Sequence, residues 1–282
     1  MASNTIIRDR RESSYESGRS EAEPKLPSCP GDPDLAAQRA RMYQLVSLVF
    51  ERPDDDFETL VADGTFTTAV QTTAAAIDDS VADAVADLPE ESAGEPLART
   101  WGSLFGVEAG VRISPYELTY LPGPLMTNIR RLADIRGFYE AFGLAIVAGR
   151  NDRTDHLCFL TEFLAILCQR EAHLREQGDR EGVAVVVDAQ RSFLEDHLGR
   201  WYWRFVDEVC EHDENGFFAD VAAGLAALVE ADIDRLDLAP EWVPDHPEVL
   251  DWNENIFGDT GRGCGPCGIA GTSDQQEDDV RE

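Results

Sequence analysis

One segment of the chain limits the possible folds more than any other: residues 157–167, taken as a helix, are apolar on nearly every face. The apolar side chains are Leu157, Phe159, Leu160, Phe163, Leu164, Ile166 and Leu167. A helix that is apolar all round cannot face water, so it belongs in the middle of a bundle. The rest of the chain must therefore supply helices that surround it.

Apolar residues recur at helical spacing on both sides of this segment. The predicted helices cover residues 34–50, 57–61, 66–88, 97–105, 126–142, 183–201 with apolar spacing that continues to 209, and 218–236. Strand patterns are nearly absent, because the β-like run 183–187 fits the helix around it. The sequence predicts an all-α fold, a single helical bundle of roughly eight to ten helices.

The two ends of the chain differ in composition from the middle. We expect a disordered N-terminal arm over residues 1–32, an all-α domain over 33–240, and an acidic, Gly-rich tail over 241–282. Arg10 and Arg11 are not followed by the apolar stretch of an export leader. No segment approaches the ~20 consecutive apolar residues of a membrane span. A soluble, cytoplasmic protein is expected.

The charge of the chain restricts its partners. The net charge is -31, from 55 Asp and Glu against 24 Lys and Arg, and Lys25 is the single lysine. Such a surface suits very high salt, where the Debye length is about 3 Å at 1 M, so we expect an extreme halophile. Binding to nucleic acid needs clustered cations, and none are present, so nucleic acid is excluded as a partner. A basic peptide would suit the chain better.

Cys264 and Cys267 form a CxxC pair in the C-terminal tail. The pair supplies two zinc ligands, which Cys29, His246 or a second chain would complete, or it is a redox dithiol, or it has neither role. The alternative functions are therefore a dithiol oxidoreductase or a metal-binding interaction protein. The remaining cysteines are interpreted as small core residues of helices: Cys158, Cys168 and Cys210.

Asp155 and His156 lie where a polar loop meets the apolar helix. One interpretation is a general base with the acid that orients it; the other is a helix start, with Thr154 as the N-cap and Asp155 in the first turn. A nucleophile elbow, a zinc-protease motif and a phosphate loop are all absent from the sequence, so no catalytic residues are expected. The other histidines show no ligand spacing, and His173 and His197, which lie within predicted helices, are interpreted as surface or satisfied core residues.

Three large side chains, Trp101, Leu104 and Phe105, form one stripe of a predicted helix. Such a stripe is by default part of the core. If it is partly exposed beside the loop at Tyr116, it becomes the floor of a groove for an apolar or amphipathic peptide. Both interpretations are open at this point.

Four motifs, in this order, resemble the TorD/DmsD/NarJ family of redox-enzyme maturation chaperones. They are Trp101-x-x-Leu104-Phe105, Pro115-Tyr116-Glu117-x-x-Tyr120, Arg136-Gly137-Phe138-Tyr139-x-x-Phe142-Gly143-Leu144 and Asp152-Arg153-Thr154-Asp155-His156. The resemblance covers residues 35–235. It implies an all-α, non-catalytic chaperone that binds the twin-arginine leader and apoprotein of a molybdopterin oxidoreductase of the dimethyl sulfoxide, trimethylamine N-oxide or nitrate reductase type.

The resemblance also implies a leader-binding groove. Its residues would be Trp101, Leu104, Phe105, Pro115, Tyr116, Glu117, Tyr120, Asp152, Asp155 and His156, with the three acids at the rim. Two positions depart from the family motif, since Asp152 replaces a glutamate and Arg153 a proline. Loss of the proline is expected to free the backbone before the helix.

Overall fold

The computed structural model describes residues 7–9, 32–89, 96–106, 113–147, 153–213 and 216–242. The chain divides into two compact units, Met1–Pro247 and Glu248–Glu282, and all described residues belong to the first. Most of the predicted C-terminal tail therefore lies outside the described residues.

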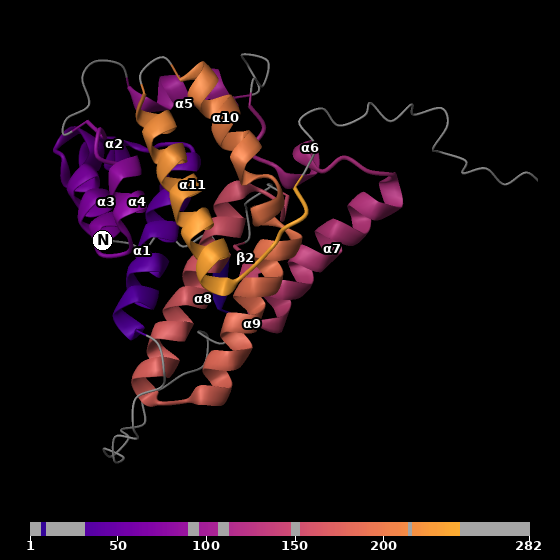
Figure 1. The fold of residues 1–282 in the computed structure, drawn as a ribbon. Coiled ribbons are helices and arrows are strands. Elements are labelled where there is room, and N and C mark those ends of the chain that lie inside the picture. Colours follow the sequence, from indigo (N-terminus) through magenta and orange to yellow (C-terminus); the bar gives the residue numbers. More distant parts are fainter. Residues whose placement is uncertain are drawn as a thin grey trace, which may run out of the picture. The chain divides into compact units, whose positions relative to one another are not determined.

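Helices make up nearly all the regular structure of the described ranges (Figure 1). The α-helices are α1 (Pro33–Phe50), α2 (Asp55–Ala62), α3 (Thr65–Ala75), α4 (Asp79–Ala84), α5 (Leu97–Phe105), α6 (Glu117–Tyr120), α7 (Leu125–Ala141), α8 (Leu157–Gln177), α9 (Arg180–Asp196), α10 (Tyr202–His212) and α11 (Phe217–Leu236), with a 3-10 helix η2 (Leu198–Arg200) after α9. The predicted all-α class is confirmed. None of these helices is both long and apolar enough to cross a membrane.

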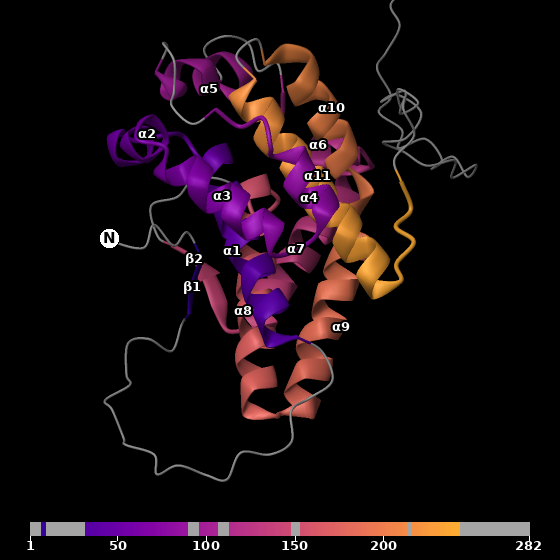
Figure 2. The same ribbon diagram turned by 60° about the vertical axis from the view of Figure 1, so that its left-hand side comes forward.

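The apolar helix at residues 157–167 is the start of α8, and it is central as predicted. Leu157, Leu160, Phe163 and Leu164 are fully buried. Helices α1 and α9 both pack along α8, and α11 packs against α1, α4 and α10. Figure 2, seen from another side, also shows α1, α8 and α9 side by side. The apolar surface of α8 is thus covered by its neighbours, which removes it from water.

The described part contains eleven α-helices, more than the predicted eight to ten. One reason is that the run 66–88 is two helices, α3 and α4. Asp78 between them has an extended backbone, and its carboxylate accepts a hydrogen bond from the Ser80 amide (2.8 Å). This cap starts a new helix inside a sequence whose apolar spacing is continuous.

The predicted helix through residues 183–209 is also interrupted, at His197. Its backbone leaves the helical region (φ -124°, ψ -102°), and η2 follows before α10 begins. In η2, a Cβ on Gly199 would collide with the carbonyl group of Leu194. Only glycine permits this close approach, so the turn depends on that residue.

A two-stranded antiparallel sheet, which the helical pattern did not predict, joins the N-terminal segment to the bundle. Strand β1 (Ile7–Asp9) pairs with β2 (Leu144–Ile146), and Ile7 lies opposite Ile146. Residues 7–9 therefore have regular structure, whereas the sequence predicted disorder for the whole arm. Gly143 precedes β2 with φ +72°, a left-handed conformation that favours glycine after the end of a helix.

A polar network is buried between the long helices α1, α8, α9 and α11. The Arg39 guanidinium donates to Asp232 Oδ1 (2.5 Å) and Oδ2 (2.6 Å), to Glu171 Oε2 (3.2 Å) and to Gln190 Oε1 (2.8 Å). The Tyr43 hydroxyl also donates to Asp232 Oδ2 (2.9 Å). Every charge here has a partner, as burial requires. The network ties four helices together at one point.

Candidate peptide-binding site

Two of the four family-like motifs meet directly in the structure. An isolated antiparallel bridge pairs Tyr116 with His156, and their rings make a T-shaped contact with centroids 5.0 Å apart. The Leu157 amide donates to the carbonyl group of Pro115 (2.8 Å). The segment before α6 therefore runs antiparallel to the segment before α8. Sequence order alone predicted that these motifs share a site, and the structure brings them together.

Asp155 is fully buried at this junction, so it is not an acid at the rim of a groove. Its carboxylate accepts hydrogen bonds from Arg153 Nε (2.9 Å) and Nη2 (2.6 Å) and from the Leu118 amide (3.1 Å). Its backbone carbonyl accepts from the Glu117 amide (3.1 Å). The Arg153 guanidinium also lies over the Tyr116 ring, 4.6 Å from the centroid. Asp155 thus connects α6 to the start of α8.

His156, not Thr154, caps α8, which corrects the predicted helix start. The ring Nδ1 of His156 accepts from the Cys158 amide (3.2 Å), and the helix begins at Leu157. Thr154 instead uses its carbonyl group to accept from the Tyr139 hydroxyl (3.0 Å). Asp155 lies before the first residue of α8 and bonds to α6. The described hydrogen bonds of the Asp155 side chain and of the His156 side chain go to different partners.

Glu117, the first residue of α6, is also fully buried, contrary to its predicted place at the rim. Oε1 lies 3.0 Å from His197 Nδ1 and 3.7 Å from Arg131 Nε, and Oε2 accepts from Trp201 Nε1 (3.3 Å). We call these four residues the Glu117 cluster. It joins α6, α7 and the two ends of η2. Arg131, His197 and Trp201 stand apart from the four motifs in the sequence, so the motifs did not predict them as site residues.

Tyr120 faces the same part of the core. Its ring stacks on Trp201, with centroids 5.0 Å apart and planes at 11°, and its hydroxyl donates to Glu208 Oε2 (2.9 Å). Burial, together with the charge of Glu208, raises the pKa of Tyr120 far above its ordinary value. The phenol therefore stays protonated and acts as a hydrogen-bond donor within the structure.

The helix stripe at Trp101 belongs mainly to the core. Leu104 and Phe105 are 2% and 5% exposed, and the Phe105 ring packs against Phe50 and Phe205, with centroids 5.8 and 6.1 Å away. Trp101 is half-buried, and its Nε1 donates to the carbonyl group of Phe50 (3.3 Å). In this conformation Leu104 and Phe105 are not the floor of an open groove.

Some predicted residues lie outside the described part of the chain: Asp152, Cys29, His246, Cys264 and Cys267. Within the described part, no cluster of His, Cys, Asp and Glu is arranged to hold a metal ion. Among the described residues, Cys158 and Cys168 are buried, as predicted. Cys210 is exposed on α10, so its assignment to the core was wrong.

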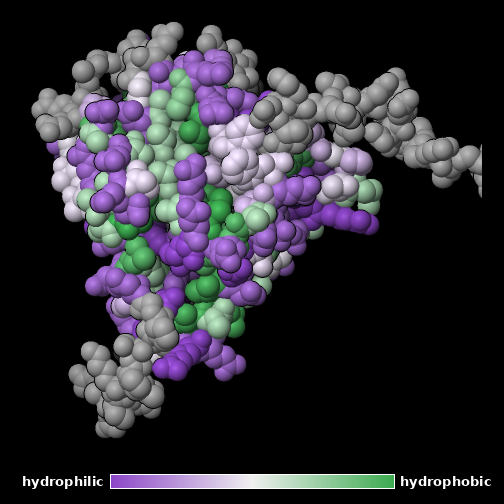
Figure 3. Space-filling view, viewed as in Figure 1, coloured by the Kyte–Doolittle hydropathy of each residue, from purple (hydrophilic) through white to green (hydrophobic). Residues whose placement is uncertain are grey.

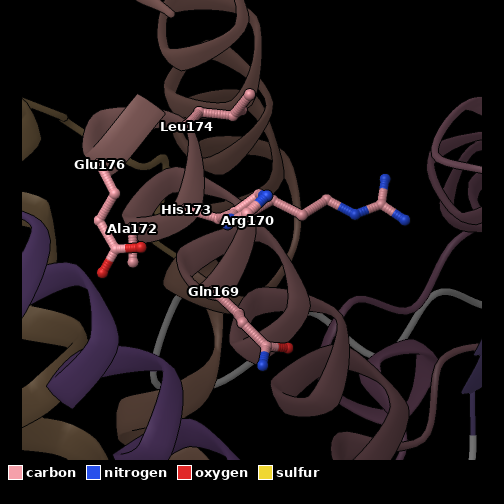
Figure 4. Close-up of a pocket in the computed structure, with 6 residues that line it drawn as sticks. All are labelled: Gln169, Arg170, Ala172, His173, Leu174 and Glu176. Atoms are coloured by element: carbon pink, nitrogen blue, oxygen red, sulfur yellow. The ribbon is translucent and has the colours of Figure 1, made fainter. Parts of the chain in front are cut away.

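Two hollows near these elements differ in what lines them. The larger, about 530 Å³, is lined by six residues that all come from α8, and Figure 4 shows the side chains of Arg170 and Glu176 directed to opposite sides. These groups do not converge on one point, so the hollow offers no common site. A second hollow of about 400 Å³ lies between α7 and η2 and includes Arg131 and His197 of the Glu117 cluster.

Comparison with known proteins identifies the family of the chain. The family model described as nitrate reductase delta subunit matches residues 63–207, just over half of the sequence, and this range contains α6 to α9 and the Glu117 cluster. The chain is 28% identical over 120 residues to a protein named chaperone protein TorD from Aliivibrio fischeri, covering 42% of this chain and 54% of that protein. A protein of the same name from Vibrio parahaemolyticus is 24% identical over 155 residues, covering 55% and 71%.

The protein of the same name from Aliivibrio salmonicida is 27% identical and is also covered over 54% of its length. The chain therefore spans about half the length of the Aliivibrio relatives that it matches. These relatives bear the name of a chaperone and not of an enzyme, in agreement with the expected lack of catalytic residues. The resemblance inferred from the four motifs is confirmed: this chain belongs to the nitrate reductase delta subunit family, and it is similar to proteins named TorD chaperones.

Proposed function

We propose that this protein is a non-catalytic, cytoplasmic chaperone that binds the twin-arginine leader and apoprotein of a molybdopterin oxidoreductase before export. The observation that carries the proposal is the junction of Pro115–Glu117 with Arg153–His156, because two motifs far apart in the sequence meet there. Family membership and the TorD-named relatives support the same role. The client would be a reductase of the dimethyl sulfoxide, trimethylamine N-oxide or nitrate type.

The chemistry of the junction suits an arginine of the leader. Arg153 already presents a guanidinium to the Asp155 carboxylate through two hydrogen bonds and to the Tyr116 ring. Carboxylate and aromatic ring together are good partners for a guanidinium. The side chain of Arg153 is 48% exposed, so it can leave. A leader arginine would take its place.

The apolar half of a leader needs apolar contacts, and the half-buried Trp101 and Tyr116 are the accessible aromatic residues of the predicted set. Leu104, Phe105 and Tyr120 are buried, so they would reach the peptide only after a rearrangement; for Tyr120 this means movement of its own segment, 113–124. Asp155 and Glu117 hold this segment to α8 and η2. Leader binding is therefore expected to loosen these contacts.

A direct binding measurement tests the proposal. Fluorescence anisotropy with a labelled twin-arginine leader peptide should show saturable binding, weakened about tenfold or more in Trp101→Ala with Tyr116→Ala, because each aromatic ring buries a large apolar area. The exposed Trp242→Ala is the matched control and should bind as the wild type does. Equal affinity in the double variant and the control, with both folded, would refute the site.

The composition supports a role in a halophilic organism, since the chain has 55 acidic residues and 24 basic ones. High salt screens the ionic part of the interaction with the leader. Apolar burial, about 25 cal/mol per Å², would then supply most of the affinity. Leader binding is accordingly expected to persist at molar salt.

A further inference from the structure

The first turns of α7 present an apolar face that the described part of the bundle does not cover. Leu125 is 71% exposed, Met126 62% and Ile129 48%. Residues 125–134 all keep part of their surface exposed, and burial on this helix starts at Ile135. Single exposed apolar residues are ordinary, but three neighbouring ones on one helix turn make a patch that suits a partner.

This apolar patch lies within a stretch that lacks acidic residues. Residues 118–133 contain Arg130 and Arg131 and no Asp or Glu, in a chain with 55 acidic residues among 282. At the right of Figure 3, the exposed end of α7 carries green side chains next to deep purple ones. The surface is thus apolar and cationic on a strongly acidic protein, which favours a partner of opposite charge.

The hollow of about 400 Å³ adjoins this part of α7. Three guanidinium groups line it, from Arg130, Arg131 and Arg200, together with His197 and the carboxylates of Asp134 and Asp196. Arg131 also contacts Glu117, and Arg200 also contacts Glu241. The lining itself thus holds three arginines and two carboxylates, and Arg130 is the arginine for which no such outside carboxylate is described.

One buried polar atom in this hollow lacks a hydrogen bond within the described residues: Nε2 of His197, whose side chain is 2% exposed. Nδ1 donates to the Glu117 carboxylate, which can only accept, so Nε2 can pair with a second carboxylate only in the imidazolium form, where it also carries a proton. Asp134 Oδ2 lies 3.4 Å from Nε2 but makes no hydrogen bond with it. A buried polar atom without a partner points to a group that comes from outside.

We propose that the first turns of α7 and the adjoining hollow form a second docking surface, which takes an apolar segment of a partner protein that carries Asp or Glu. The apolar residues of that segment lie on Leu125, Met126 and Ile129. Its carboxylate enters the hollow, among the arginines and the imidazolium of His197, where it displaces Asp134. The inference rests on the proposed chaperone function, and it assigns to the client a contact separate from the basic leader.

Two synthetic helical peptides test the charge preference on the full-length protein. One places leucines on one face with glutamates beside them, and the other has lysines in place of the glutamates. Fluorescence anisotropy in moderate salt should show the glutamate peptide binding at least about tenfold more tightly, because the surface is cationic. Equal binding, or tighter binding of the lysine peptide, would overturn the inference.

Variants with matched controls locate the surface. Leu125→Ser with Ile129→Ser should weaken the glutamate peptide about tenfold, through lost apolar burial. Val185→Ser, at a residue 58% exposed on α9, should have no effect. An equal loss in Val185→Ser would overturn the proposal.

The charged residues should act in opposite directions. Arg130→Glu should weaken the glutamate peptide, whereas Asp134→Asn should strengthen it several-fold, because the competing carboxylate is gone. Arg180→Glu, at an exposed arginine of α9, is the control for added negative charge and should change little. Weakening by Asp134→Asn would contradict the assigned carboxylate position.

Failure of this inference differs from failure of the proposed function. If the leader peptide binds and the glutamate peptide does not, the docking surface alone is wrong. If the glutamate peptide binds and the leader does not, the leader site alone is wrong. If the protein sediments as a dimer that Leu125→Ser with Ile129→Ser dissociates, the face binds a second copy of the chain and the inference is overturned.

Discussion

Two buried carboxylates, Asp232 and Asp155, are each held by an arginine through two hydrogen bonds, but their arginines differ. Arg39, the partner of Asp232, comes from a different helix and is itself buried. Arg153, the partner of Asp155, lies two residues away in the chain, and its side chain is 48% exposed. The first pair is closed on all sides by protein, and the second borders solvent.

This difference separates a structural role from a binding role. In a buried pair, removal of one partner leaves a charge without solvent or counter-charge, which is strongly destabilising. In the Arg153 pair, Asp155 is buried but keeps the hydrogen bond from the Leu118 amide, and water can take the place of the half-exposed Arg153, so the loss costs less. The Arg39 pair should therefore affect folding, whereas the Arg153 pair should affect what binds at Asp155.

The largest expected effect is on the Asp232 network. Asp232→Ala should lower the free energy of unfolding by about 3–5 kcal/mol, because Arg39 then stays buried without its main counter-charge. Denaturant unfolding at constant salt measures this. Asp234→Ala, at an exposed position of the same helix, is the control and should lie within about 0.5 kcal/mol of the wild type. Similar losses of unfolding free energy in Asp232→Ala and Asp234→Ala would show that the buried Asp232 network stabilises the fold no more than a surface acid does.

A smaller effect is expected in the pH dependence. Burial raises the pKa of Asp232, but the charge and hydrogen bonds of Arg39 outweigh it, so the net pKa lies below the ordinary value. For a carboxylate whose pKa is lowered by folding, the stabilisation is present above the unfolded pKa of about 3.9 and is lost as pH falls through the folded pKa.

The difference in unfolding free energy between the wild type and Asp232→Asn should therefore be constant near neutral pH and shrink in acid. Unfolding curves at a series of pH values below about 5 measure it. A difference that stays constant down to the lowest pH at which both proteins fold would show that Asp232 is not ionised in the native state.

Helical periodicity predicted most of the fold, because burial of an apolar face is what fixes a helix in a bundle. It placed the apolar segment of α8 at the centre, where it lies. It did not find the break at Asp78, since a capping side chain acts within one turn and leaves the apolar spacing unchanged. It also did not find Asp232, although a carboxylate inside the stripe of Val229 and Leu236 indicates a buried partner.

The site was predicted in part. The family resemblance implied that Tyr116 and His156 lie close together, and the bridge between them shows that they do. The exposure of its side chains was not predictable, because Glu117 and Asp155 look like surface acids in a chain so rich in them. Their burial depends on Arg153, His197 and other residues that meet them only in three dimensions.

The smallest effect on stability, and the clearest on binding, is expected at Arg153. Arg153→Gln should lower the free energy of unfolding by about 1–2 kcal/mol, less than Asp232→Ala, because the buried Asp155 keeps the Leu118 amide and water can reach the place of Arg153. Leader peptide should bind several-fold more tightly, since the leader arginine no longer competes with Arg153 for Asp155. Anisotropy with the leader, at low and molar salt, measures this.

Arg136→Gln is the control for Arg153→Gln, because Arg136 makes a surface ion pair with Glu140 on α7 and its side chain is 67% exposed. Both variants remove one positive charge, so both increase the general attraction of the acidic protein for a basic peptide. Exchange of Arg153 for the leader arginine at Asp155 is indicated only if Arg153→Gln increases the affinity for the leader more than Arg136→Gln does. Tighter binding to the same extent in both would reduce the effect to net charge, and weaker binding in Arg153→Gln would mean that Arg153 helps to hold the leader.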